Sequence, residues 1–78
     1  METIKDYQEF IYNAGKIDAE NGNHFNKESL IEDYSNQACN QFPELNLDYA
    51  RIFDDFEHCY NAGFETYYEA EPSIHNLA

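Results

Sequence analysis

The stretch LDYARIFDDFEHCYNAGFETYYEA, residues 47–70, is the longest regular pattern in this chain of 78 residues. Its bulky apolar residues recur at steps of three and four, which is the spacing of one face of an amphipathic helix. They are Tyr49, Ile52, Phe53, Phe56, Tyr60, Phe64 and Tyr67. Acidic residues stand between them, together with a single basic one, Arg51. We therefore expect a long helix with one aromatic face that forms the core and another face that presents carboxylates.

The first part of the chain predicts a helix over residues 4–21. Thr3 and Asp6 have the spacing of a capping pair, and an acidic residue suits the positive end of a helix. The stripe expected to be buried consists of Ile4, Tyr7, Phe10, Ile11, Ala14 and Ile17. Residues 21–23, Asn-Gly-Asn, should end this helix because Gly and Asn tolerate the left-handed conformation.

A second helix is expected over residues 27–41, capped by Asn26 or Ser29 and ended by Pro43. Its apolar stripe consists of Leu30, Ile31, Tyr34, Ala38 and Phe42. The third helix is expected over residues 47–71, with Asn46 as its cap and Pro72 at its end. The last residues, 73–78, are expected to form a short disordered tail.

These three helices predict an all-α fold. The chain contains no Val and no run in which apolar and polar residues alternate, so strands are not expected. Its length suits one small domain, residues 1–78. Three helices with short connections favour an up-down-up three-helix bundle.

A four-residue sequence, YNAG, occurs twice, at residues 12–15 and at residues 60–63, inside the first and third predicted helices. A glycine within a helix costs about 1 kcal/mol relative to alanine, so both glycines require a reason. One hypothesis is that the two helices cross at these small residues, with Tyr12 and Tyr60 on either side. The alternative is that Gly63 divides the third helix into segments 47–61 and 64–71.

The charge of the chain is its most unusual property. Sixteen acidic residues against four basic ones give a net charge of −12. Phosphate contacts require Lys and Arg, so direct binding to nucleic acid is not expected. The aromatic content of 17% argues against a disordered chain. The N-terminus lacks the pattern of a signal peptide and no segment is long and apolar enough for a membrane span, which favours a cytoplasmic protein.

The sequence offers no catalytic or metal-binding pattern. It lacks the paired Cys or His spacings of zinc sites, and Cys39 and Cys59 are expected to be reduced thiols. A calcium-loop reading of residues 18–29 fails because Asn23 and Ser29 stand where Gly and Glu are required. No serine lies in a nucleophile motif. We therefore expect no enzymatic activity, no metal and no cofactor.

The carboxylates themselves remain as the candidate functional feature, because acids three or four residues apart repel one another and gain little within the chain. The expected partner-binding residues lie on the outer flanks of the first and third helices, with Tyr12, Tyr67 or Tyr68 as stacking anchors. They are Asp6, Glu9, Tyr12, Glu20, Asp54, Asp55, Glu57, Glu65, Tyr67 and Glu69.

In its small size, its strong negative charge, its Tyr and Phe content and its acidic clusters, the chain resembles phage-encoded anti-CRISPR and anti-restriction proteins that mimic nucleic acid. The clusters are Asp54, Asp55 and Glu57, and the acids between residues 65 and 71. The resemblance covers composition and no specific motif. It implies an inhibitor that binds a basic, nucleic-acid-binding surface of a host defence protein in the bacterial cytoplasm. The alternative is a helical adaptor or assembly factor that uses an aromatic patch, either as a monomer or as a homodimer.

Overall fold

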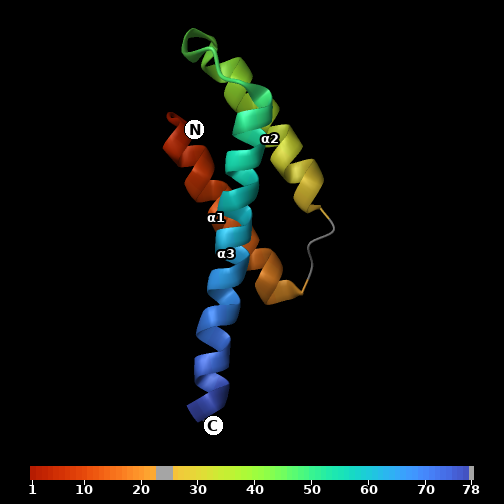
Figure 1. The fold of residues 1–78 in the computed structure, drawn as a ribbon, viewed down its shortest axis with the longest axis vertical. Helices are drawn as coiled ribbons and strands as arrows, with labels where there is room; N and C mark the ends of the chain where they lie inside the picture. Colours follow the sequence, from red (N-terminus) through yellow and green to blue (C-terminus); the bar gives the residue numbers. More distant parts are fainter. Residues whose placement is uncertain (23–25, 78) are drawn as a thin grey trace.

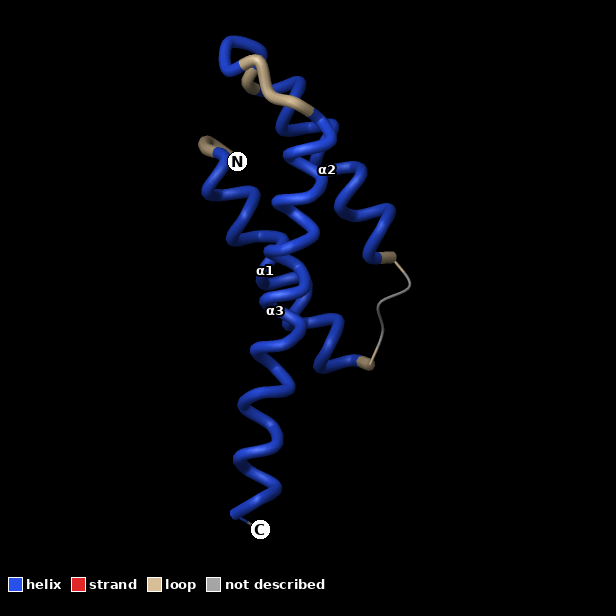
Figure 2. Tube along the Cα trace, viewed as in Figure 1, coloured by secondary structure: helices blue, strands red, loops and turns tan. Residues whose placement is uncertain are grey.

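The computed structural model describes the backbone of residues 1–22 and 26–77, and the side chains of residues 1–22 and 26–68. It contains helix α1 (Ile4–Asn21), helix α2 (Lys27–Gln41), a short 3-10 helix η1 (Pro43–Leu45) and helix α3 (Tyr49–Leu77). All regular structure in these ranges is helical (Figure 2). The prediction of an all-α three-helix bundle is therefore confirmed.

The helices are arranged around α3, which runs along most of the length of the molecule (Figure 1). Helix α1 crosses α3 near its middle and makes the most extensive contact with it, while α2 packs beside the N-terminal half of α3. The C-terminal part of α3 extends beyond both other helices (Figure 1). The molecule is therefore elongated, with Cα extents of 52 × 21 × 18 Å.

The boundaries of α1 and α2 agree with those expected. The Thr3 hydroxyl accepts a hydrogen bond from the Asp6 amide at 3.2 Å, and the Asp6 carboxylate accepts from the amides of Glu2 and Thr3 at 3.0 Å. Gly22 ends α1 in the left-handed conformation, with a φ of 66°. Asn26 occupies the N-cap position of α2, although its side chain makes no capping hydrogen bond.

The boundaries of α3 differ from those expected. Asn46 does not cap it; the Asp48 carboxylate does, accepting a hydrogen bond from the Ala50 amide at 3.0 Å. The reason is that Pro43 starts a 3-10 turn, and Asn46 ends that turn at a φ of 49°, so the helix begins two residues later than predicted.

At its other end the backbone of α3 is helical through Pro72 as far as Leu77, although residue 71 was the expected end. Proline has no backbone N–H, so α3 lacks the hydrogen bond that residue 72 would otherwise donate to the carbonyl four residues before it. The expected disorder of the tail concerns residues whose side chains lie outside the described part of the chain, and it stays a prediction.

The core lies where α1 and α2 meet the middle of α3. Its buried apolar residues are Tyr7, Ile11, Ile31, Ala38, Ile52, Phe56 and Tyr60. Three residues of the expected apolar stripes are instead exposed, namely Phe10 (41%), Ile17 (54%) and Tyr49 (39%). Three helices of this length enclose only a narrow stripe of each helix, so residues at the edges of the stripes remain accessible.

The two glycines of the YNAG segments meet at the crossing of α1 and α3. A Cβ atom on Gly15 would lie under 3.0 Å from the carbonyl oxygen of Tyr60, and one on Gly63 would lie equally close to that of Tyr12. Real Cβ atoms do not approach so closely, so the two backbones touch only because both positions are glycine. The crossing hypothesis is confirmed, and Gly63 does not interrupt α3.

The tyrosines of the same segments complete a reciprocal contact. The Tyr12 hydroxyl hydrogen-bonds the Thr66 hydroxyl at 2.9 Å, and the Tyr60 hydroxyl donates to the Asp18 carboxylate at 2.5 Å. Each tyrosine thus reaches a residue three positions beyond the glycine of the other helix. The two segments are therefore equivalent partners in one approximately two-fold contact.

Candidate protein-interaction surface

Four of the acidic residues expected to bind a partner also have contacts within the chain. Asp6 caps α1, and the amides of Glu2 and Thr3 lower the pKa of its carboxyl. Asp55 accepts a hydrogen bond from the Gln8 amide at 2.7 Å, which ties α3 to α1.

The other two have weaker contacts. The Glu57 carboxylate lies 3.6 Å from the Lys27 ammonium, and the Asp54 carboxylate lies 3.8 Å from the ring of His58, an exposed pair. An exposed ion pair contributes little to stability, so Asp54 and Glu57 remain accessible to a partner. Asp6 and Asp55 are better explained as structural residues.

Three of the expected acids make no such contacts, namely Glu9, Glu20 and Glu65. All three are exposed, and no ion pair or hydrogen bond engages their carboxylates within the described ranges. Lys5 and Lys16 stand one helical turn before Glu9 and Glu20 but form no ion pair with them in the described part of the chain, so all three carboxylates add to the self-repulsion of a chain of net charge −12. They are the acids most available to a basic partner.

Glu20 of α1 and Glu65 of α3 point away from each other. Each residue advances about 100° around a helix, so Glu65 lies roughly 160° around α3 from Gly63, and Glu20 lies roughly 140° around α1 from Gly15. Because the two glycines face each other across the contact, both glutamates lie on outer sides of the crossing. A flat surface could therefore contact Glu20 or Glu65, whereas only an enclosing groove could contact both.

The expected tyrosine anchors are also partly engaged. Tyr12 is half-buried and its hydroxyl is bound to Thr66. Tyr67 is half-buried and its ring lies 5.5 Å from that of Tyr68. Tyr68 itself is 47% exposed and is the most accessible ring in this part of α3. The side chain of Glu69, another expected binding residue, lies outside the described part of the chain.

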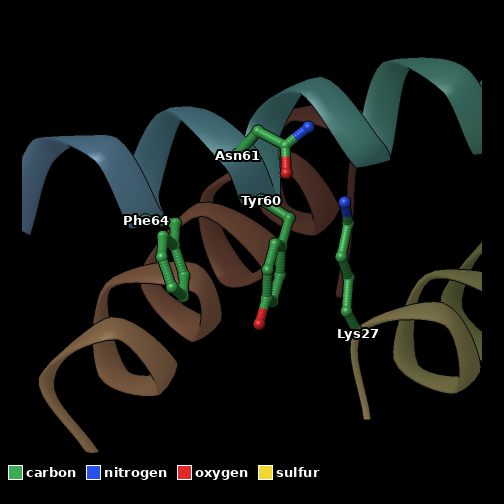
Figure 3. A pocket seen from close by; sticks show the side chains of 4 residues that line it. All are labelled: Lys27, Tyr60, Asn61 and Phe64. Atoms are coloured by element: carbon green, nitrogen blue, oxygen red, sulfur yellow. The ribbon is translucent and has the colours of Figure 1, made fainter. Parts of the chain in front are cut away.

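A hollow of about 210 Å³ lies beside this region, between the start of α2 and the middle of α3. Lys27, Tyr60, Asn61 and Phe64 line it. Figure 3 shows the rings of Tyr60 and Phe64 side by side on the same side of α3, with the Lys27 side chain running up alongside Tyr60. The sequence patterns indicated only that Phe64 belongs to the core, but the structure leaves it half-buried at the edge of this hollow.

A second hollow of about 360 Å³ opens between α1 and α3. Its lining consists of Lys5, Gln8, Glu9, Tyr12, Asn13 and Cys59. Burial, with a smaller effect of the Asp55 charge, raises the pKa of the Cys59 thiol, so this cysteine is disfavoured as a nucleophile. Both Cys39 and Cys59 are free thiols.

Other kinds of site find little support. Across the residues whose side chains are described, no three His, Cys, Asp or Glu side chains gather closely enough to hold a metal ion. Among the described helices, none combines the length and the apolarity needed to cross a bilayer. No family model, no curated protein and no solved structure matches this chain.

Proposed function

We propose that this protein is a non-enzymatic inhibitor that binds a basic, nucleic-acid-binding surface of a host defence protein, as anti-CRISPR-like mimics of DNA or RNA do. The observation that carries the proposal is the presence of exposed carboxylates without internal partners on a folded scaffold. Glu9, Glu20 and Glu65 make no ion pair or hydrogen bond among the described residues, whereas Lys and Arg of a nucleic-acid channel would pair with them. Such a partner would lose its access to phosphate while the inhibitor is bound.

The strong charge also predicts how the complex forms. Long-range attraction between a chain of net charge −12 and a basic surface accelerates association and weakens with added salt. The target, in this proposal, lies in the cytoplasm of a bacterial host. Neither a metal nor a cofactor takes part.

The test is capture of partners by the immobilised full-length protein from a nuclease-treated bacterial lysate, followed by competition. We expect the captured proteins to be nucleic-acid-binding, to elute as salt increases, and to be displaced by added DNA or RNA. Capture that persists unchanged in excess nucleic acid would contradict the proposal, because the two ligands would not share a surface.

Matched charge reversals identify the face used. Asp54→Lys/Glu65→Lys changes α3, Glu9→Lys/Glu20→Lys changes α1, and Glu32→Lys/Asp33→Lys makes the same charge change on the exposed side of α2. We expect at least one of the first two pairs to reduce capture by about tenfold or more relative to the α2 pair. Equal losses for all three pairs would show attraction by net charge alone and would argue against a mimic.

A second function, a helical adaptor or assembly factor, is favoured by a separate observation. Several large apolar side chains are exposed, among them Phe10, Ile17, Leu45 and Tyr68. They are spread over both ends of the molecule, but Phe10 and Ile17 are seven residues apart and share one side of α1. Sedimentation distinguishes the two functions, since a dimer insensitive to salt favours the adaptor and a monomer favours the inhibitor.

A further inference from the structure

One flank of α3 combines aromatic rings with carboxylates. Glu57, Asn61, Phe64 and Tyr68 follow one another at steps of four, three and four residues, so they form a single ridge along the helix. Glu65 lies beside this ridge, between Asn61 and Tyr68. The ridge passes along the 210 Å³ hollow that Tyr60, Asn61 and Phe64 line together with Lys27.

The rings on this flank form a continuous row. The ring centroids of Tyr60 and Phe64 are 6.2 Å apart in a stacked arrangement, and those of Phe64 and Tyr68 are 5.3 Å apart. Exposure increases along the row, from 1% at Tyr60 to 47% at Tyr68. The outer end of the row therefore offers an aromatic surface to a partner, and the inner end is secured in the core.

The structure already shows how a cation binds here. The Lys27 ammonium lies 3.6 Å from the Glu57 carboxylate and 5.8 Å from the centroid of the Tyr60 ring. One carboxylate and one aromatic face thus hold a positive charge together (Figure 3 shows Lys27 beside Tyr60). About two turns further along the helix, Glu65 and the ring of Tyr68 repeat this pair of groups. The carboxylate of Glu65 has no cation beside it within the described residues.

We propose that this flank of α3 receives an arginine side chain of the basic partner. The guanidinium stacks on the ring of Tyr68 and pairs with the Glu65 carboxylate, and the side-chain oxygen of Asn61 accepts one of its N–H groups. Arginine fits better than lysine because its planar, weakly hydrated group can stack on a ring and keep its charge paired at the same time. The inference rests on the proposed function for the basic character of the partner, and it specifies which side chain of that partner is recognised.

A peptide probe tests the site without the natural partner. The ¹⁵N-labelled full-length protein is titrated with the capped peptide acetyl-Gly-Arg-Gly-Arg-Gly-amide and, separately, with its lysine counterpart, at low salt. We expect the arginine peptide to shift the side-chain amide of Asn61 and the backbone amides of Phe64 and Tyr68 in a saturable way. The lysine peptide should bind about threefold more weakly, because it loses the stacking.

Two pairs of variants control for fold and charge. Tyr68→Ala should weaken binding of the arginine peptide by about threefold or more. Tyr49→Ala, which removes a similarly exposed tyrosine near the start of α3, should leave its binding unchanged. Glu65→Gln should weaken it more than Glu9→Gln, which removes the same charge from α1. Thermal unfolding of each variant shows that its fold is intact.

Two results would overturn the inference. One is equal shifts on all acidic faces; the other is equal behaviour of Tyr68→Ala and Tyr49→Ala. Either would mean that the peptides report net charge alone.

The failure of the proposed function is a separate outcome. If the arginine site is confirmed but captured proteins keep their nucleic acid, the site stands and the inhibitor does not. If nucleic acid displaces the captured proteins but Tyr68→Ala leaves their capture unchanged, the proposed inhibitor function stands and the arginine site does not.

Discussion

The two YNAG segments have identical sequences but unequal environments. Gly15 and Gly63 play the same part, since each allows the carbonyl of the other segment's tyrosine to approach. Tyr60, in contrast, is 1% exposed, whereas Tyr12 is only half-buried. Identical local sequence thus produced identical backbone contacts and different burial.

The difference arises from α2. Its first residue, Lys27, lies over the ring of Tyr60, and Ile31 belongs to the same buried cluster as Tyr60. The ring of Tyr12 lies on the other side of the crossing and borders the open hollow between α1 and α3. A third element, not the repeated segment, therefore decides which tyrosine becomes part of the core.

Alanine at either crossing glycine should have the largest effect on stability. Gly15→Ala or Gly63→Ala gains about 1 kcal/mol in helix propensity, but the new Cβ collides with a backbone carbonyl that cannot move without separating the helices. We expect a net loss of about 2–4 kcal/mol in the free energy of unfolding, measured by urea denaturation. Asn13→Ala, an exposed change on the same helix, should be neutral or slightly stabilising.

The double variant sharpens this prediction. Once one Cβ has forced the helices apart, the second finds space, so Gly15→Ala/Gly63→Ala should cost clearly less than the sum of the single changes. Additive losses would show that each glycine acts alone, and the reciprocal description of the contact would be wrong.

Removing either tyrosine hydroxyl should have a smaller effect on stability than the glycine changes, and the two losses should differ. Tyr60→Phe removes a buried hydroxyl that donates to the charged Asp18, and we expect a loss of about 1.5–3 kcal/mol. Tyr12→Phe removes a hydrogen bond between two neutral hydroxyls at a half-buried site, and about 0.5–1 kcal/mol is expected. Both losses in the free energy of unfolding are measured by urea denaturation. Equal losses would contradict the conclusion that the two tyrosines lie in different environments.

The smallest expected effect is a fall in stability at alkaline pH caused by Tyr60. Burial first, and then the hydrogen bond and charge of Asp18, raise the pKa of Tyr60 above its ordinary value of 10.0. A group with a raised folded pKa stabilises the fold fully below its unfolded pKa and loses this effect as pH rises towards its folded pKa. Stability should therefore fall above about pH 10. Tyr60→Phe should reduce that fall, as followed by thermal unfolding at pH 8–11.

The local structure of α1 could be predicted from sequence alone. Thr3, Asp6 and Gly22 act through neighbours within a few residues, so the capping pattern was sufficient to place both ends. The predicted start of α3 was wrong because two neighbouring residues could both have capped the helix. Asn46 and Asp48 are both good caps, and the 3-10 turn at Pro43 decided between them.

The candidate surface was predicted less completely. The exposed positions of Glu9, Glu20 and Glu65 follow from helical spacing. The internal contacts of Asp55 and Tyr12 do not, because Gln8 and Thr66, their partners, lie 47 and 54 residues away in the chain. The hollow beside Phe64 was also missed, since its lining comes from two helices whose relative position no local pattern specifies.

The sequence by itself determined three helices, their amphipathic faces, the excess of carboxylates and the repeat that marks the crossing of α1 and α3. These features depend on residue type and on spacing within one helix. Only the tertiary structure decided that Glu20 and Glu65 point apart, that Tyr60 is buried while Tyr12 is not, and that Phe64 borders a hollow. Those features depend on the relative positions of helices distant in sequence, which the contact of two glycines and the placement of α2 determine together.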